Sequence, residues 1–418
     1  MESSIHTIAS NNLLIIFGIV AITGIVCSII SEKIKVPDVV LFLIAGILIG
    51  PSVFKFIDIS IYQVENQLIL TFGSAFILYL GGKEISLKVL RHVKISVFLL
   101  SSVGVLISAF IIQQIVGLTF GVSSMTSLLI GAIISSTDPA TLVPIFNQIS
   151  IKDKVKQTVI SESAFNDATG AILTSAVLAI ILSGKFSLIE NLYELSVMII
   201  VGVIVGITTG IVLLKLVTDK PYGIFKDFTP IISIISVIIA YELSTKFGGS
   251  GYMSCFIVGM ITGNKKNFKV WLTQKSYDAD CQVAETLGTI CRMSIFIILG
   301  SQVDLNMLAK YFLPSLLVVL GLMFIARPIC VLVCTIFDRK AKWSKKEILF
   351  MMWVRETGVI PAALCGIISA MKIPGYEVIS SIVFMTILIT LIVQGSTTKI
   401  VAKKLGVLEA ENKLIITD

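Results

Sequence analysis

The sequence predicts an all-α polytopic membrane protein with about thirteen transmembrane helices. Of its 418 residues, 56% are hydrophobic and only 14% are charged, and the mean hydropathy is +0.98. A soluble domain of this size carries roughly 25% charged residues. Apolar runs long enough to cross a hydrocarbon core recur along the whole chain. Because lipid offers no partners to backbone N–H and C=O groups, each run must be a helix.

The predicted spans follow one another with short polar loops between them, so residues 1–418 are read as a single membrane domain. The spans are 11–30, 38–55, 66–82, 93–117, 125–147, 156–183, 192–216, 228–246, 249–263, 282–303, 309–337, 346–371 and 376–400.

Basic residues gather on one side of this arrangement. Most of the 33 lysines and arginines lie in loops that follow odd-numbered spans. The even-numbered loops hold only Lys55, Lys185, Lys246, Lys310 and Lys372. Because cytoplasmic loops carry the excess of Lys and Arg, the N-terminus is predicted outside and the C-terminus in the cytoplasm. The same distribution explains the net charge of +7 without a nucleic-acid partner.

Two stretches of the chain repeat one pattern with the same spacing. Leu80 ends an apolar run 58 residues before Asp138, and Leu299 ends a similar run 58 residues before Thr357. Both endpoints lie in spans broken by proline or glycine, at Pro139, Pro144, Gly358 and Pro361. The copies begin an odd number of crossings apart, so their orientations are opposite. Inverted repeats with interrupted spans at matching positions are typical of secondary transporters with a midplane binding site.

Three acidic residues lie inside predicted spans, namely Asp138, Glu162 and Asp167. A carboxylate at a helix centre costs roughly 2.5–3.5 kcal/mol on insertion scales, so each is a functional candidate. The alternative is that they pair with arginines inside the spans and only hold helices together. This alternative applies most readily to Glu162.

Helical spacing separates the roles of these groups. Ser163 and Asp167 are four residues apart and share one helix face. A hydroxyl beside a carboxylate, opposite the broken span that carries Thr137 and Asp138, supplies the oxygen ligands that hard cations prefer. A break at Pro139 also frees backbone carbonyls for coordination. Asp138 and Asp167 are therefore the candidate ion carriers.

The same two carboxyl groups are candidates for proton exchange. Burial and a neighbouring negative charge both favour the protonated form of a carboxylic acid. A site that holds either a proton or a cation, and opens to each side of the membrane in turn, performs antiport. The chemistry alone does not identify the cation.

Several motifs, which run in order over nearly the whole chain, closely resemble those of NhaP-type sodium/proton antiporters of the monovalent cation:proton antiporter-1 family. They are residues 136–144 (STDPATLVP), 162–167 (ESAFND), 35–38 with 41–43, 249–253, 326–328 and 358–364. The resemblance implies a thirteen-helix homodimer with a dimerisation domain and a six-helix ion-translocating bundle in which two interrupted helices cross. Ranges 66–183 and 282–404 are the expected inverted repeats, which supply part of the bundle, and 11–55 and 192–263 are the expected scaffold.

Carried over by position, the resemblance makes Asp167 the carboxylate that exchanges cation for proton. Asp138, Ser163 and the backbone at Thr137 would complete a sodium site. Asn166 stands where electrogenic relatives carry a second Asp, so the resemblance implies electroneutral, one-for-one exchange.

The resemblance also implies a supporting ion pair and reveals one departure. Glu162 would pair with Arg327 on span eleven and stabilise the bundle. The family usually has Arg immediately before Gly-Val-Val/Ile-Pro, whereas this chain has Thr357 there, with Arg355 and Glu356 just upstream. The second interrupted helix is therefore expected to be held differently, which leaves potassium open as the transported cation.

The sequence thus predicts an electroneutral sodium/proton antiporter of the cell membrane that acts in pH homeostasis, a membrane protein and not an enzyme, with no cofactor. Its expected partners are Na⁺, Li⁺ or K⁺, protons, lipid and a second copy of the chain. The alternatives are a potassium/proton antiporter, an ion-coupled symporter, a cation channel, or an intramembrane enzyme in which Asp138 and Asp167 form an aspartyl dyad.

Overall fold

The structure is a computed structural model of the chain. It describes residues 2–34, 36–59, 62–138, 142, 146, 149–184, 188–219, 223–268 and 270–408. These residues are helical throughout apart from turns, short extended segments and one isolated β-bridge between Ile151 and Leu408.

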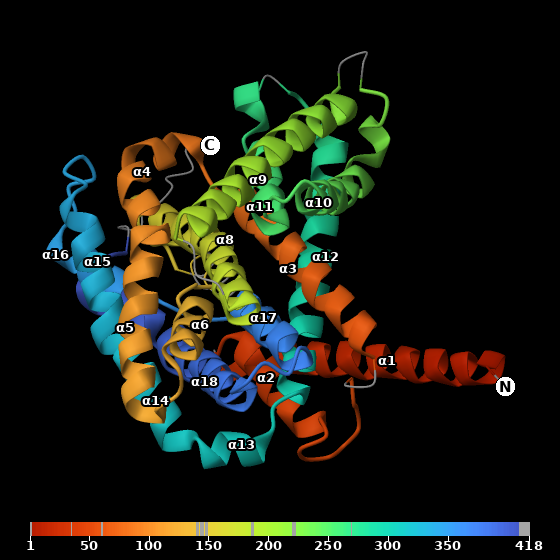
Figure 1. Ribbon diagram of the computed structural model, residues 1–418. Helices are drawn as coiled ribbons and strands as arrows, with labels where there is room; N and C mark the ends of the chain where they lie inside the picture. Colours follow the sequence, from red (N-terminus) through yellow and green to blue (C-terminus); the bar gives the residue numbers. More distant parts are fainter. Residues whose placement is uncertain are drawn as a thin grey trace.

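The described residues form helices that are connected by short loops (Figure 1). In chain order they are α1 (Glu2–Ile34), α2 (Asp38–Ile49), α3 (Gln63–Glu84), α4 (Leu87–Ser101), α5 (Val103–Phe120), α6 (Ser124–Ile134), α8 (Asp153–Ser183), α9 (Leu188–Val217), η1 (Lys226–Phe228), α10 (Thr229–Lys246), α11 (Gly251–Gly263), η2 (Lys265–Phe268), α12 (Gln274–Ser301), α13 (Leu305–Lys310), α14 (Phe312–Gly321), η3 (Leu322–Ala326), α15 (Arg327–Ile336), α16 (Lys345–Trp353), α17 (Val359–Ala370), α18 (Tyr376–Ile389), η4 (Thr390–Gly395) and α19 (Ser396–Leu405).

Each predicted span corresponds to a helix or to helices joined end to end, which confirms the all-α fold. Within the described ranges, nine helical segments are long and apolar enough to cross a membrane. Four shorter apolar helices, α2, α6, α11 and α17, stand where spans two, five, nine and twelve were predicted. Spans five and twelve are the two expected to be interrupted.

Some boundaries differ from the predicted ones for local reasons. Span two was expected to reach residue 55, but α2 ends at Ile49, where Gly50 adopts an extended backbone. Span ten was expected to begin at residue 282, but the helix starts eight residues earlier at Gln274. There the side chain of Thr273 accepts the backbone N–H of Ser276 and caps the helix. Residues 274–281, most of which are polar, therefore continue this helix beyond the boundary that hydropathy predicts.

One group of helices consists of α1, α2, α3, α9, α10, α11 and α12, which pack against one another. In Figure 1, α9, α10 and α11 lie together at the upper right, and α1 extends away from the rest at the lower right. Glycines bring some of these backbones into contact. A Cβ on Gly300 of α12 would fall 2.2 Å from the carbonyl oxygen of Leu43 in α2. Small residues at a crossing are how membrane helices obtain close van der Waals packing.

The second group consists of α4, α5, α6, α8 and α14 to α19. In Figure 1, α4, α5, α15 and α16 lie at the left, and α6, α8, α17 and α18 lie in the middle of the molecule. Helix α17 also contacts α3 and α12 of the first group. The first helices of the two predicted repeats, α3 and α12, thus pack mainly with the first group.

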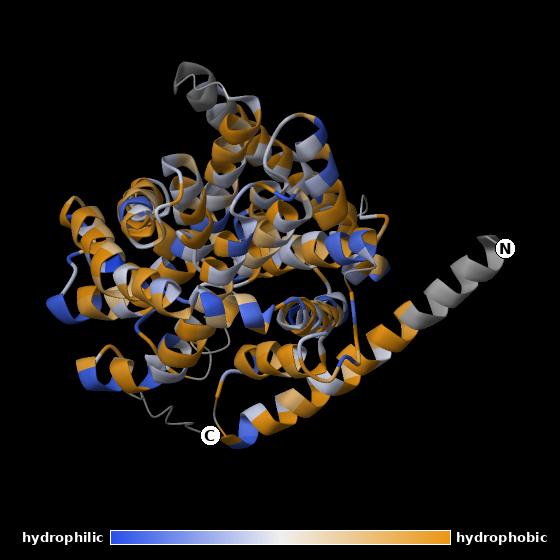
Figure 2. Ribbon diagram, turned by 60° about the horizontal axis from the view of Figure 1, so that its bottom comes forward, coloured by the Kyte–Doolittle hydropathy of each residue, from blue (hydrophilic) through white to orange (hydrophobic). Residues whose placement is uncertain are grey.

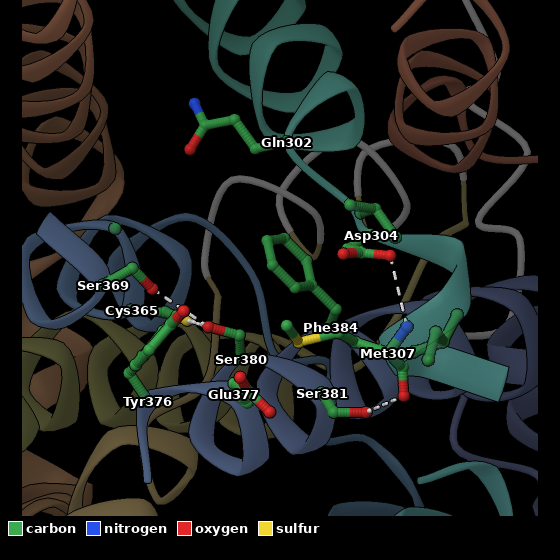
Figure 3. Close-up of a pocket in the computed structure, with 13 residues that line it drawn as sticks. Gln302, Asp304, Met307, Cys365, Ser369, Tyr376, Glu377, Ser380, Ser381 and Phe384 are labelled. Carbon is green, nitrogen blue, oxygen red and sulfur yellow. Dashed lines mark hydrogen bonds between the residues drawn. The ribbon is translucent and has the colours of Figure 1, made fainter. Parts of the chain in front are cut away.

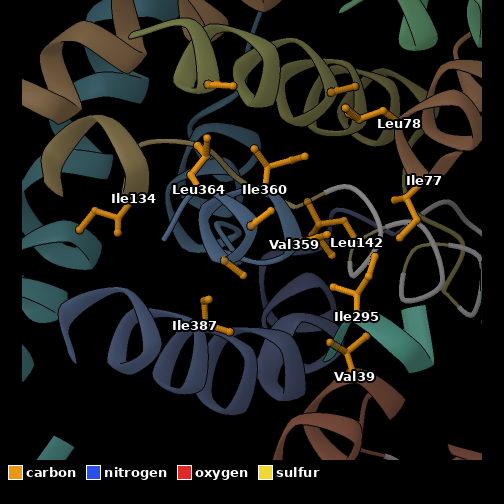
Figure 4. Close-up of a cluster of buried hydrophobic side chains, with 14 of the residues drawn as sticks. Val39, Ile77, Leu78, Ile134, Leu142, Ile295, Val359, Ile360, Leu364 and Ile387 are labelled. Atoms are coloured by element: carbon orange, nitrogen blue, oxygen red, sulfur yellow. The ribbon is translucent and has the colours of Figure 1, made fainter. Parts of the chain in front are cut away.

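Apolar side chains from both groups surround α17 (Figure 4). Val39 of α2, Ile77 of α3 and Ile295 of α12 approach from the first group, and Ile134 and Ile387 from the second. All five are buried. The start of α17, where span twelve resumes, is therefore shielded from lipid and solvent.

Helices at the periphery of the molecule consist largely of hydrophobic residues, as a bilayer requires (Figure 2). On α1 the side chains of Leu14, Ile22 and Ile25 are each more than half exposed. Charged and polar residues are found mainly toward the ends of the helices and in loops. The structure and the composition therefore agree on a multi-pass membrane protein.

Candidate functional site

The first predicted break lies where α6 ends. Helical structure stops at Ile134, and residues 136–138 have no regular structure, although all three are buried. Beyond Asp138, the predicted break markers Pro139 and Pro144 lie outside the described residues. The structure therefore defines the entry into this break and places Thr137 and Asp138 on it.

The second predicted break separates α16 from α17. Residues 354–358 are non-helical and fully or almost fully buried, and Thr357 and Gly358 lie among them. Pro361 is the third residue of α17. Its missing N–H costs nothing there, because the first-turn N–H groups of a helix have no intrahelical partner. The predicted position of this break is thus the observed one.

The two breaks contact each other through their backbones. The N–H of Asp138 donates to the carbonyl oxygen of Glu356 over 2.8 Å. A Cβ on Gly358 would lie 1.9 Å from Oδ2 of Asp138, so only a glycine admits the carboxyl group at this point. The Asp138 carboxyl group therefore sits against the N-terminal end of α17, where the helix dipole favours a negative charge.

Two buried arginines each donate to carbonyl groups at the C-terminal end of the helix that precedes a break. Arg355 donates through Nη2 to the carbonyl oxygens of Ile134 and Ser135, over 3.1 and 2.8 Å, at the end of α6. Arg327 donates to the carbonyl oxygens of Met351 and Val354 at the end of α16. Terminal carbonyls have no partners within their own helix and carry partial negative charge. Each guanidinium group therefore stabilises one helix end inside the membrane.

Arg327 also forms an ion pair with Glu162 of α8. Its Nη1 contacts Oε1, and its Nη2 donates to Oε2 over 3.0 Å. Both side chains are about 2% exposed. Such a bidentate pair joins α8 to α15 and, through the carbonyls of α16, to the second break.

Facing the first break, α8 presents Ser163, Asn166 and Asp167, all buried. The hydroxyls of Thr137 and Ser163 are 2.7 Å apart. The amide of Asn166 accepts the backbone N–H of Thr137 over 3.0 Å and donates to its hydroxyl over 2.9 Å. These contacts fix the end of α6 against α8 and place two hydroxyl oxygens next to the turn of α8 that carries Asp167.

Asp167 is 2% exposed, and its Oδ1 has no hydrogen-bond partner within the part of the chain that the structure describes. Asp138 lies close enough for the two charges to interact. A buried carboxylate oxygen without a donor is costly unless a proton or a cation occupies it. The structure thus brings together all four residues predicted as ion ligands, and it leaves one carboxylate oxygen available.

Some contacts of this site were not predicted. Thr390 accepts the backbone N–H of Thr357, and Gln394 donates to the carbonyl oxygen of Trp353. Both residues lie in η4, a π-helical segment, which commonly marks functional sites. A sequence signal exists, because polar residues recur every fourth position of span thirteen and are fully buried, namely Thr386, Thr390, Gln394 and Thr398.

A cavity of about 280 Å³ lies at the far end of α17 from the breaks (Figure 3). The ends of α12 and α17, α13 and the start of α18 line it. Asp304 accepts the backbone N–H of Met307, and the hydroxyls of Ser369 and Ser380 are 3.0 Å apart. The sequence analysis did not single out this cavity. The cavity, which polar groups line, lies at the C-terminal end of the second interrupted helix.

Two interrupted helices that meet inside a polytopic α-helical protein, with buried carboxylates and hydroxyls beside them, define a secondary ion transporter. The chain belongs to the sodium/hydrogen exchanger family, whose transmembrane model matches residues 18–404. The predicted resemblance is therefore confirmed.

The chain is similar to proteins named as cation/proton antiporters. The chain is 30% identical to Na(+)/H(+) antiporter 1 of Methanocaldococcus jannaschii, over 93% of this chain and 94% of that protein. It is 27% identical to the K(+)/H(+) antiporter NhaP of Alkalimonas amylolytica, over 94% of this chain and 67% of the relative. The solved structure of the sodium proton antiporter MjNhaP1 at pH 8 matches with a TM-score of 0.81 and 28% identity, covering 94% of this chain and 99% of that one.

Proposed function

We propose that this protein exchanges sodium, or a similar monovalent cation, for protons across a cell membrane. The observation that carries the proposal is the buried constellation of Asp167, Asp138, Ser163 and Thr137 beside the crossing of two interrupted helices. Carboxylate and hydroxyl oxygens suit a small hard cation. The sodium antiporters among the relatives support the choice of ion.

Competition for the same oxygens couples the two fluxes. Asp167 holds either a cation or a proton, and Asp138 and the two hydroxyls complete the cation site. The residues of both breaks are buried. The site must therefore open before an ion can enter or leave, and it opens to one side of the membrane at a time. A carboxylate that is emptied on one side must take up the other ion before it returns, which is exchange.

One cation is exchanged for one proton in this proposal. Asn166 occupies the position at which a second Asp would add another exchangeable proton. Its amide is committed to the backbone and hydroxyl of Thr137. The site therefore gains a single positive charge in either loaded form, and turnover moves no net charge.

Potassium is the second candidate cation. Two observations favour it: a curated relative is a K(+)/H(+) antiporter, and Thr357 replaces the Arg that is usual in the family. Initial exchange rates with sodium, lithium and potassium, measured at several pH values, distinguish these cations.

Orientation and assembly complete the proposal. The loop charges support an N-terminus outside the cell and a C-terminus in the cytoplasm. The exposed apolar side chains of α1 face lipid or a second copy of the chain, and a homodimer through the helices of 11–55 and 192–263 accounts for them. The inverted repeats 66–183 and 282–404 then contribute the moving bundle. No cofactor takes part.

Proteoliposomes that contain a pH-sensitive dye test the function. Sodium added outside is expected to dissipate a preset proton gradient without creating a membrane potential. A current that follows the potential would instead indicate a channel. Transport of an organic solute along with sodium would indicate a symporter, and cleavage of a membrane peptide that Asp138→Asn abolishes would indicate an enzyme.

A further inference from the structure

Residues 85–86 form a short linker between α3 of the first group of helices and α4 of the second group. Both residues have a non-helical backbone. Ile85 is 1% exposed, and its N–H donates to the carbonyl oxygen of Gly82 over 3.1 Å. Other backbone groups in and beside this linker are bound by the side-chain amides of Asn264 and Gln157, which come from different groups of helices.

Asn264 binds the linker from the side of the first group. It is the residue that follows α11, and its Nδ2 donates to the carbonyl oxygen of Ile85 over 2.7 Å and to that of Met260 over 2.8 Å. Its Oδ1 accepts the N–H of Leu87 over 3.1 Å. One amide therefore joins the end of α11 to the linker and to the start of α4.

The end of α3 is fixed within the first group. A Cβ on Gly263 of α11 would lie 2.3 Å from the carbonyl oxygen of Lys83, so the two helices are in backbone contact there. The ammonium group of Lys83 contacts Oδ2 of Asp280 in α12 over 2.8 Å. Oδ1 of Asp280 in turn accepts the hydroxyl of Ser233 in α10 over 2.6 Å. The last turn of α3 is thus tied to α10, α11 and α12.

Helix α4 is fixed within the second group in the same way. The N–H and the hydroxyl of Ser96 both donate to Oδ2 of Asp338, over 3.0 and 2.8 Å. Trp343 donates through Nε1 to the hydroxyl oxygen of Ser96 over 2.8 Å. Asp338 and Trp343 lie between α15 and α16. A movement of one group against the other must therefore be absorbed in the linker, since hinges are short segments at the ends of helices.

Gln157 binds the linker from the side of the second group. It lies in the second turn of α8, and its Oε1 accepts the N–H of Ser86 over 3.0 Å. Its Nε2 donates to the carbonyl oxygen of Glu84, the last residue of α3, over 3.2 Å. The bond to Glu84 joins the two groups directly. Because hydrogen bonds weaken steeply with distance and angle, it cannot survive a rotation of α8 away from α3.

The connection between α12 and α13 has the same local structure at the opposite end of the molecule, where α13 lies at the bottom of Figure 1 and α4 at the top. Asp304 precedes α13 with φ −84° and ψ 105°, and Ser86 precedes α4 with φ −86° and ψ 111°. Val303 is buried, as Ile85 is. The carbonyl oxygen of Val303 accepts the hydroxyl of Ser52 from the first group over 2.6 Å. Both connections are therefore held from the first group.

Only the linker at 85–86 is also held from the second group. At the other connection, Gln302 donates to Asn66 of α3 in the first group over 3.2 Å, and Asp304 caps its own helix. Among the described residues, no side chain of the second group forms a hydrogen bond with the backbone of 302–304. The 280 Å³ cavity borders this connection instead. A contact with the second group is thus not needed to form such a connection.

We propose that Gln157 is a positioning residue whose contact with the linker is made and broken in each exchange cycle. Asn264 keeps the linker on the first group throughout the cycle. Gln157 holds α8, which carries Asp167, against the end of α3 while the site is closed to this face of the membrane. It releases Glu84 and Ser86 when the second group moves to open the site to this face. The inference rests on the exchange proposed above.

The distance between spin labels on the two groups tests this role. Lys266 and Lys340 are exposed, follow α11 and α15 respectively, and accept labels as cysteines once the seven native cysteines are replaced. Gln157→Ala should raise the ratio of long to short distances by about fivefold or more, because two hydrogen bonds of one conformation are lost. Gln113→Ala is the matched control, since its amide also makes two contacts, both with Ser124 inside the second group.

Asn264→Ala separates the two sides of the linker. It should lower the melting temperature without raising the ratio of long to short distances, because the bonds of Asn264 are present in both conformations. An unchanged ratio in folded Gln157→Ala, or an equal rise in Asn264→Ala or Gln113→Ala, overturns the proposal.

The distance measurement requires no transport. Sodium/proton exchange by the wild type with an unchanged ratio in Gln157→Ala would count against the role of Gln157 alone. A shifted ratio in a protein that exchanges no cation for protons would count against the proposed function alone.

Discussion

Gly358 and Asp138 are in contact at the crossing of the two interrupted helices, so closely that a Cβ on Gly358 would lie 1.9 Å from the carboxyl Oδ2 of Asp138. The relationship joins the two breaks beside the proposed ion site. The carboxyl group of one break lies against the first backbone groups of the helix that follows the other break. Any displacement of α17 therefore displaces Asp138 as well.

Gly358→Ala should abolish exchange. The added methyl group must push the Asp138 carboxyl group or the start of α17 away, which destabilises the protein by about 1–3 kcal/mol and disrupts the cation site. Gly366→Ala, on the same helix, is the matched control, because its Cβ would meet only Leu70 at an ordinary 3.7 Å. Exchange by purified Gly358→Ala at the rate of the control would contradict the assignment of Asp138 to the site.

Removing one member of the Glu162–Arg327 pair should lower stability more than it alters cation affinity. An unpaired buried charge costs about 3–5 kcal/mol, so Glu162→Gln and Arg327→Ala should each lower the melting temperature markedly. Because both residues serve one contact, the double variant should lose less than the sum of the two. An unchanged melting temperature with a large change in apparent sodium affinity would make the pair part of the ion site.

Arg355→Met should destabilise the first break. The substitution leaves the carbonyls of Ile134 and Ser135 without their donors, at a cost of about 1–3 kcal/mol for each buried group. Arg355→Lys should recover part of this loss, because an ammonium group can reach one or both oxygens. Arg339→Met, at an exposed position, is the control. Equal melting temperatures for the Arg355→Met and Arg339→Met variants would contradict the capping role.

Asn166→Asp should change the charge moved in each cycle. The new carboxylate lies next to Asp167 on α8 and adds one negative charge, so a second proton is needed to neutralise the site. Solid-supported-membrane recordings should show a sodium-dependent current for this variant and none for the wild type. Asn306→Asp, in an exposed segment, is the control. A silent Asn166→Asp variant that still exchanges sodium would contradict the link between Asn166 and electroneutrality.

Much of this architecture could be predicted from the sequence because its causes are local. An apolar run must be helical in lipid, and Gly358 and Pro361 mark the end of one helix and the start of the next. Asp138 and Asp167 stand out because acids are rare inside spans. Ser163 follows from helical spacing, four residues before Asp167.

The unpredicted features depend on contacts between distant segments. Every residue has a backbone carbonyl, so nothing in the sequence indicates that Arg355 donates to Ile134 and Ser135. The contact of Asp138 with Glu356 likewise arises only when the breaks meet. A signal for Thr398 does exist in the four-residue spacing of polar residues along span thirteen. The sequence gives no indication, however, of which break these residues face.

The central claim is that a cation and a proton compete for the carboxyl group of Asp167. It is tested most directly by adding sodium to the purified protein in weak buffer with a pH dye. Wild-type protein should release one proton for each sodium ion bound, whereas folded Asp167→Asn should release none and should not exchange. Asp153→Asn, at the exposed start of the same helix, should behave as wild type. Undiminished proton release and exchange by Asp167→Asn would contradict the account.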